Sequence, residues 1–200
     1  MRLGASICSP FSCTCGAAVD SRGAHGLSCL KSAGRQPRHA QVNDLIFKAF
    51  SRAGIPSVKE PTGLLPLSNL RPDGVTIIPW SQGKCLAWDF TCPDTVAPSS
   101  LQGSAYTAGS AAERAARLKT QKYLQLSSSH TFIPVAIETF GSINAEGMNL
   151  ISRLGGKIIA ATGDKRERMF LFQQLSLAIQ RGNIASFTGA LRQDIYFQDS

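Results

Sequence analysis

The sequence predicts a mixed α/β domain preceded by a small cysteine-rich module. Apolar residues make up 43% of the 200 residues, which is enough to form one buried core. From residue 39 onward, segments with helical apolar spacing alternate with segments typical of strands. Residues 8–38 lack apolar periodicity and are rich in cysteine, glycine, serine and arginine. We therefore predict two units, a module over residues 1–38 and the α/β domain over residues 39–195.

A helix is the first element predicted in the α/β domain. Between Ala40 and Ala53 the apolar residues recur at helical spacing, and Gly54 followed by Pro56 ends the pattern. A short extended piece over residues 57–60 then leads into a loop.

Two strands joined by a tight turn follow this loop. We predict strands over residues 75–80 and 84–92, with Ser81-Gln82-Gly83 as the turn. Alternate residues of a strand face opposite sides of a sheet, so the large apolar residues of the second strand share one face. Asp89 therefore points to the other side.

The remaining elements complete the α/β pattern. The Gly/Ser/Pro-rich segment 93–109 is predicted to be a connection, and Ser110 and Glu113 have the spacing of a helix capping box. A buried strand over residues 132–140 makes a right-handed strand–helix–strand crossover. Two further helical segments are expected, over residues 146–161 and 164–191.

Potential metal ligands are concentrated in the cysteine-rich module. They are Cys13, Cys15, His25 and Cys29. Thiolates and an imidazole can close a tetrahedral zinc site, which would stabilise a module too small to be held by burial alone. The alternative interpretation is a set of incidental thiols and a surface histidine, and Cys8 is a possible replacement for one ligand.

Two acidic residues of the hairpin are predicted to lie close together. With the turn centred on Gln82, residue 75 lies opposite Asp89, and Asp73 is its diagonal neighbour at roughly 7 to 8 Å. Two carboxylates at this distance suit Mg²⁺ or Mn²⁺, and Glu60 is a candidate third ligand. An Arg-Pro-Asp-Gly turn alone would explain Asp73, but not an aspartate inside a strand.

Two lysines fall on the apolar side of the helix that follows Ser110. A helical projection places Lys119 and Lys122 there, with Tyr123 beside them. One interpretation is that both ammonium groups extend to solvent along their aliphatic stems. The other is that one lysine turns toward the sheet and meets the acidic pair.

Charge and the N-terminal segment constrain partners and location. The formal net charge of +8 favours a polyanionic partner such as nucleic acid. The first residues contain no sustained apolar run, so we predict neither a signal peptide nor a membrane span. The expected location is nuclear or cytoplasmic, not secreted.

Several short motifs resemble a known family along nearly the whole chain. They are CTCG, HGLSC, GRQPRH, RPDG, WDFTC and KTQKY. Together they resemble the C-terminal region of site-specific non-LTR retrotransposons, which ends in a zinc knuckle and a restriction-like endonuclease of the PD-(D/E)xK superfamily. The resemblance implies a restriction-endonuclease-like core with the element order αβββαβ. It also implies a reverse transcriptase upstream of this region. No such enzyme precedes the region here, so we expect a fragment, a decayed copy or a domesticated remnant.

The resemblance also implies roles for particular residues. Asp73 and Asp89 match the metal-binding acids, and Lys119 or Lys122 with Tyr123 matches a displaced lysine–tyrosine motif. In the superfamily pattern a lysine stands two residues after the second acid, whereas this chain has Thr91.

The function expected from these features is that of a Mg²⁺- or Mn²⁺-dependent endodeoxyribonuclease. The Arg-His motif at Arg38 and His39, together with Arg35, is expected to bind nucleic acid. DNA is the expected partner, with the RNA of the element as a further one. Two alternatives remain, a DNA-binding zinc module that has lost cleavage and a structural zinc protein with a protein partner.

Overall fold

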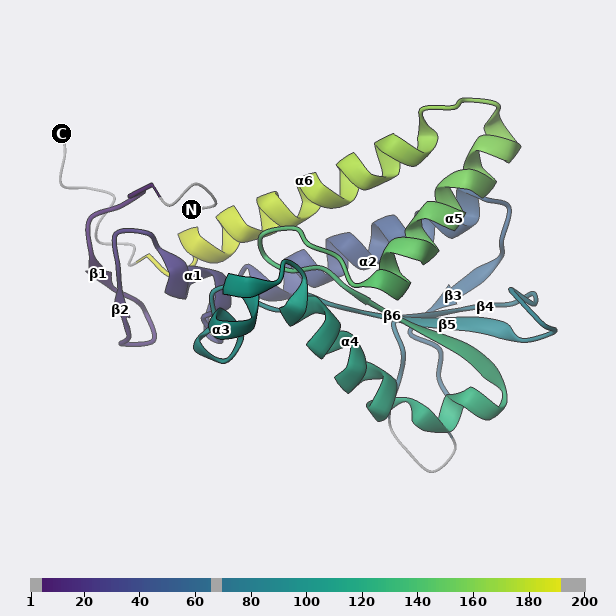
Figure 1. Cartoon of the computed structure of the whole chain (residues 1–200), viewed down its shortest axis with the longest axis horizontal. Coiled ribbons are helices and arrows are strands. Elements are labelled where there is room, and N and C mark those ends of the chain that lie inside the picture. The colour runs from purple at the N-terminus through teal and green to yellow at the C-terminus, as the bar shows by residue number, and fades with distance from the viewer. Residues whose placement is uncertain (1–4, 66–69, 192–200) are drawn as a thin grey trace.

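The computed structural model describes residues 5–65 and 70–191. It contains a four-stranded sheet between layers of helices, with a small module beside the end of the longest helix (Figure 1). The module consists of β1 (Phe11–Ser12), β2 (Ala18–Val19) and α1 (Ala24–Ser28). The end of the predicted second unit, residues 192–195, lies outside the described residues.

The larger part of the chain alternates helices and strands. Its elements are α2 (Arg35–Arg52), β3 (Ser57–Lys59), β4 (Gly74–Thr76), β5 (Cys85–Thr91), α3 (Pro98–Tyr106), α4 (Ser110–Lys122), the 3₁₀ helix η1 (Leu124–Ser128), β6 (His130–Ala136), α5 (Ala145–Thr162) and α6 (Glu167–Thr188). The strand order is β3-β4-β5-β6, in which only the pair β5–β6 is parallel. The predicted mixed α/β class is therefore confirmed.

The sheet has a different helical layer on each face. Leu86, Trp88 and Phe90 of β5 pack with α2, α5 and α6 in the main core, and the Trp88 ring stacks on Phe50 at 4.5 Å. The intervening Ala87 packs on the other face with Tyr123 at the end of α4. Figure 1 shows α4 on the side of the sheet opposite α5 and α6. The predicted division of β5 into two faces is thus confirmed.

The first helix begins earlier than its apolar pattern indicates. α2 starts at Arg35 and includes Pro37 in its first turn, where a missing amide hydrogen costs nothing. The predicted boundary after residue 38 therefore falls inside a helix. Gly34 lets this helix start close to α6, because a Cβ there would overlap the backbone of Ser186.

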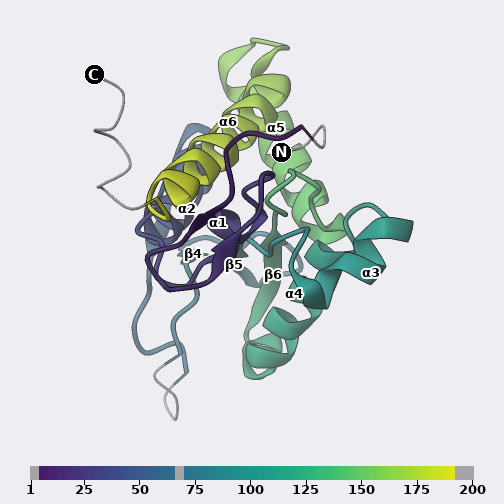
Figure 2. The ribbon, with the colours of Figure 1, turned by 90° about the vertical axis from the view of Figure 1, so that its left-hand side faces the viewer.

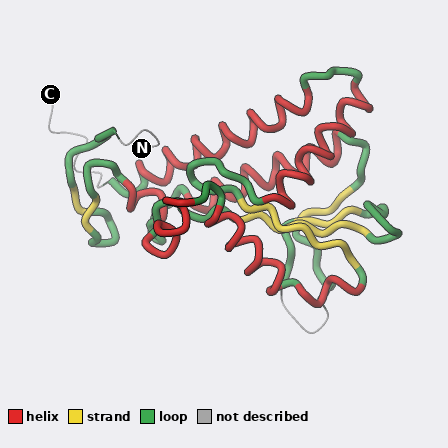
Figure 3. The backbone as a smooth tube through the Cα atoms, in the orientation of Figure 1, coloured by secondary structure: helices red, strands yellow, loops and turns green. Residues whose placement is uncertain are grey.

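Two other elements differ from the sequence prediction. Segment 93–109 contains the helix α3, which begins with a proline at its first position, so it is not purely a connection (Figure 3). β4 is shorter than predicted, because the Thr76 hydroxyl takes over the ladder contact and accepts a hydrogen bond from the Leu86 amide at 3.0 Å. Residues 77–80 then form a wider loop before the turn.

The observed hairpin register brings the two acids closer than predicted. Gly74 pairs with Trp88 and Val75 with Ala87. The next residues along the two strands are Asp73 and Asp89, which therefore lie opposite each other. The predicted register paired residue 75 with Asp89 and is wrong by two positions. The wide loop after β4 explains the difference, because the turn alone does not determine the pairing.

The predicted capping box does not form at α4. The Glu138 carboxylate, just beyond β6, accepts hydrogen bonds from the first two free amides of α4, those of Ala111 and Ala112, each at 3.0 Å. Glu113 instead accepts a hydrogen bond from the Ala145 amide at the start of α5. Both carboxylates thus lie at positive helix N-termini, but each belongs to a different element.

The small module packs firmly against α6. The Ser32 hydroxyl donates a hydrogen bond to the Ser186 carbonyl at 2.7 Å, and the rings of Phe11 and Phe187 meet edge to face. Figure 2 shows the module in front of α2 and α6. None of the helices in the described part of the chain has the length and apolar character needed to cross a bilayer.

Candidate metal centre and acidic site

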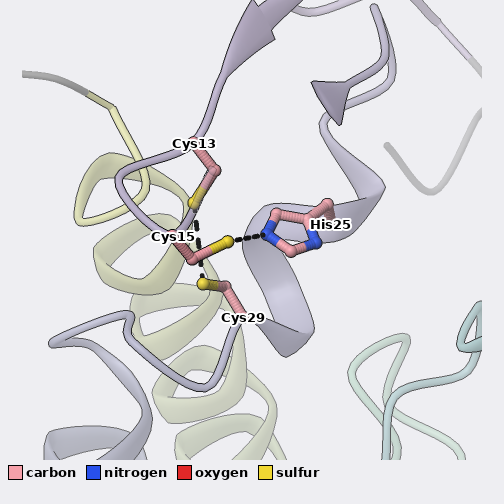
Figure 4. Close-up of side chains that lie close together, drawn as sticks. All are labelled: Cys13, Cys15, His25 and Cys29. Atoms are coloured by element: carbon pink, nitrogen blue, oxygen red, sulfur yellow. Dashed lines mark hydrogen bonds between the residues drawn. The ribbon is translucent and has the colours of Figure 1, made fainter. Parts of the chain in front are cut away.

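The predicted zinc ligands converge in the small module. Cys13 and Cys15 lie on the turn after β1, while His25 and Cys29 come from α1 and its C-terminal end. The four ligand atoms all lie within 4.8 Å of one another. Figure 4 shows the three sulfur atoms and the imidazole directed toward a common point.

The spacing of these atoms is close to that around a tetrahedral zinc ion. Zinc–sulfur bonds of about 2.3 Å place two sulfur ligands about 3.8 Å apart. The sulfur atoms of Cys13 and Cys29 lie 3.6 Å apart, and Cys15 Sγ lies 3.1 Å from His25 Nε2. Cys8 is not part of this group, since its thiol lies against the backbone carbonyl of Asp20.

The surroundings of the site act differently on two of its thiols, because burial raises the pKa of Cys29 whereas the pKa of Cys13 is lowered. Burial alone would raise the pKa of the Cys13 thiol, but hydrogen bonds from the backbone and side chain of Cys15, and from neighbouring side chains, lower it to about 6. Apart from the cysteines, the apolar cluster here is small: Val19 and Ala190, with Phe11 packed against it. A bound zinc ion would therefore supply much of the stability of this module.

We expect the purified chain to carry close to one equivalent of zinc. Replacing Cys29 by Ser removes a buried thiolate from the group and should abolish stoichiometric zinc binding. Elemental analysis under reducing, chelator-free conditions measures this. Cys85→Ser is the matched control, since its thiol lies in β5 outside the group. Wild-type protein without zinc would refute the zinc site.

The second site is built around Asp73 at the start of β4. Its Oδ2 accepts a hydrogen bond from the Phe90 amide at 2.6 Å and lies 3.3 Å from His39 Nε2. The hydrogen bond to Asp73 raises the pKa of His39. One turn later on α2, Asn43 donates from its amide to the Asp73 carbonyl and accepts from the Trp88 indole. α2 therefore holds both the side chain and the backbone of Asp73.

Asp89 lies in β5 beside Asp73 and is almost fully buried. Its Oδ1 accepts a hydrogen bond from the Tyr123 hydroxyl at 3.0 Å, and its Oδ2 forms an ion pair with Lys119. Burial raises the pKa of the Asp89 carboxyl, the negative charge of Asp73 raises it further, and Lys119 opposes both. A cation beside both carboxylates would relieve this repulsion.

The two helix lysines have different surroundings. Lys119 reaches the sheet and pairs with Asp89, whereas the ammonium group of Lys122 lies over the Tyr123 ring at 5.1 Å. Tyr123 itself is 1% exposed, and its single hydroxyl proton is shared between Asp89 Oδ1 and the Arg71 carbonyl, which lies 2.7 Å away. Of the two candidates, Lys119 is thus the one in contact with an acid.

Glu60 does not join the acidic pair as a close third ligand. Its amide donates to the Asp73 carbonyl, but its side chain is exposed. Among the described residues, only the Cys/His group brings three or more potential ligand side chains close enough together to hold one ion. Glu60 has a positive φ of 46°, a strained conformation for this residue, next to the candidate site.

The residues predicted to bind nucleic acid differ in exposure. Arg35 is exposed at the start of α2, and His39 is partly exposed beside Asp73. Arg38 is 3% exposed and donates to Asn183 of α6 at 2.8 Å. Its long side chain passes over Gly182, where a Cβ would overlap it. This position gives Arg38 a packing role between α2 and α6.

Sequence reasoning missed two residues that organise the acidic site. Asn43 and Glu138 are both buried, and each satisfies backbone or ring donors of another element. A polar residue on an apolar helix face was the available signal for Asn43. Glu138 follows a buried strand, and nothing in its local pattern indicates which helix it caps.

Comparisons with known proteins do not assign a family. No protein-family model matches this chain, and no curated protein matches it. The geometry of the two sites is therefore the basis for assigning a function.

Proposed function

We propose that this chain is a metal-dependent endonuclease that cleaves phosphodiester bonds of DNA. The observation that carries the proposal is the meeting of Asp73, Asp89 and Lys119 at one place on the sheet. Asp73 and Asp89 occupy opposing positions, next to the Gly74–Trp88 pair of β4 and β5. Lys119 of α4 contacts Asp89. Two acids and a lysine in contact provide both metal ligands and a cation for a developing negative charge.

The order of elements supports the same assignment. α2, β3, β4, β5, α4 and β6 follow the order αβββαβ of the PD-(D/E)xK core, with α3 inserted before α4. We propose that the chain has that fold and that it originates in the endonuclease region of a non-LTR retrotransposon. The zinc module in front of the core is the other feature that favours this origin.

Asp73 and Asp89 would hold the catalytic Mg²⁺ or Mn²⁺ ion. Carboxylate oxygens are the ligands that both ions prefer, and the pair lies on the two central strands, β4 and β5, beside the partly exposed His39 of α2. When bound, such an ion would lower the pKa of a coordinated water molecule and neutralise negative charge on a phosphate.

The chain's own residues organise the remainder of the reaction. The Phe90 amide and His39 fix the orientation of the Asp73 carboxylate, and the Tyr123 hydroxyl fixes that of Asp89. The Lys119 ammonium is a donor held beside the acids, where it orients the attacking water or stabilises negative charge on the phosphate. Glu138 holds the start of α4 and so helps to position Lys119.

One observation favours a second candidate, a DNA-binding module without cleavage. Both oxygens of Asp89 already have partners within the protein, Tyr123 and Lys119. Such a site can persist as a buried ion pair after catalysis is lost. DNA binding without nicking would favour this candidate.

A plasmid nicking assay tests the proposal. We expect the zinc-loaded chain to nick supercoiled DNA with Mg²⁺ or Mn²⁺ and to leave it intact with Ca²⁺, which takes a larger and more flexible ligand shell. No nicking with either ion would contradict the assignment. Equal nicking without an added divalent ion would also contradict it, because the acids would then have no metal to hold.

A further inference from the structure

A groove runs from the loop after α1 to His39, next to the acidic site. Its volume is about 720 Å³, which falls within the range of ligand-binding pockets. One wall is the loop after α1, including Ala33, and the other is the end of β5, including Thr91. The first turn of α2 lies between them and ends at His39, which contacts Asp73.

The groove has a positive lining. Arg35, Arg38 and His39 all line it, and none of the described residues that line it is acidic. A concave surface with charges of one sign concentrates the field and attracts ligands of the opposite charge. The groove therefore suits an anion.

The start of α2 adds to this positive field. α2 has 18 residues; the Gly34 amide before it donates to the Ser32 hydroxyl at 3.3 Å, and no side chain of the described residues is seen to cap the amides that follow. The first amide groups of a helix lack intrahelical acceptors and carry the positive end of the helix dipole. Phosphate groups bind readily at such ends.

Arg38 provides an independent indication of a ligand. Its two terminal nitrogens have partners, Asn183 Oδ1 at 2.8 Å and the Leu27 carbonyl at 3.4 Å. Its Nε atom is buried and has no hydrogen-bond partner within residues 5–65 and 70–191, although Arg38 is only 3% exposed and lines the groove. An unsatisfied buried donor is unfavourable, and an anion oxygen in the groove would satisfy it.

We propose that this groove binds a phosphate of the DNA strand next to the phosphate that is cut. The inference rests on the proposed nuclease function and specifies how the strand is held. Arg35, the first amides of α2 and Arg38 Nε receive the neighbouring phosphate. His39 lies between that phosphate and Asp73. The zinc module thus forms one wall of the DNA path.

Fluorescence anisotropy with a short labelled DNA duplex, without added Mg²⁺ or Mn²⁺, tests the groove separately from cleavage. Arg35→Ala should weaken binding about tenfold and reduce the salt slope by about one. Ala33→Trp should weaken it by a similar factor without changing the charge, because the indole fills the groove. Arg181→Ala removes the same charge as Arg35→Ala from an exposed position on α6 and should bind within about twofold of wild type.

The outcomes separate this proposal from the nuclease assignment. Wild-type affinity in either Arg35→Ala or Ala33→Trp, with normal zinc content, overturns the groove even if the wild-type chain cleaves DNA. Selective loss of binding in both variants supports the groove even if no condition gives cleavage. An Arg181→Ala variant as weak as Arg35→Ala overturns it, because binding would then follow net charge alone.

Discussion

Asp89→Asn is expected to reduce the DNA nicking rate by at least about a thousandfold, measured on supercoiled plasmid with Mg²⁺ or Mn²⁺. The change removes a charged metal ligand while keeping the shape of a side chain that is 3% exposed. Asp73→Asn should have the same effect, since it removes the other ligand. DNA affinity should stay unchanged or rise slightly, because negative charge near a polyanion is lost.

The control for both variants is Asp44→Asn. Asp44 lies on α2 and pairs with Lys59. Its substitution by Asn therefore removes one negative charge, as in the other two variants, but outside the acidic site. It should nick at the wild-type rate. If Asp89→Asn or Asp73→Asn also nicks at that rate, the carboxylate pair is not the metal site. Loss of folding in Asp89→Asn, seen by circular dichroism, would indicate that this residue is needed for structure.

Lys119→Ala is expected to lower the single-turnover cleavage rate by about a hundredfold or more, with little change in DNA affinity. The reason is that its ammonium group is the cation in contact with Asp89. Lys122→Ala is the matched control from the same helix, because its ammonium lies over the Tyr123 ring. That variant should keep a rate within a few fold of wild type.

A double variant distinguishes catalysis from support of the fold. Lys119→Ala leaves the Asp89 carboxylate buried without its cation, so it should also lower the thermal midpoint. Adding Asp89→Asn removes the uncompensated charge and should restore much of that midpoint, while cleavage stays absent. Unchanged single-turnover cleavage in Lys119→Ala would exclude this lysine from the reaction and favour the DNA-binding module without cleavage.

Features encoded within one segment were predictable from the sequence. The alternation of apolar residues in β5 placed Asp89 on the face opposite Trp88, and the structure agrees. Helical spacing also located α5 and most of α2. Start positions were less predictable, because Pro37 and Pro98 can begin helices as well as interrupt them.

Features that depend on two segments were predicted less well. The register of β4 against β5 differed by two positions, because the Thr76 side chain ends the ladder and widens the following loop. Glu113 has the spacing of a cap for its own helix, yet its carboxylate binds the start of α5. In each case a side chain found a better partner on an element distant in sequence.

The sequence by itself determined the mixed α/β class, the group of cysteine and histidine ligands and the two carboxylates of the hairpin. These follow from local periodicity and from residue types that carry metal-binding side-chain groups. Only the tertiary structure decided that Lys119 contacts Asp89, that Arg38 is buried, and that His39 faces Asp73. The physical reason is that long side chains can extend either way from a helix, and the packing of α2 and α4 on the sheet selects the direction.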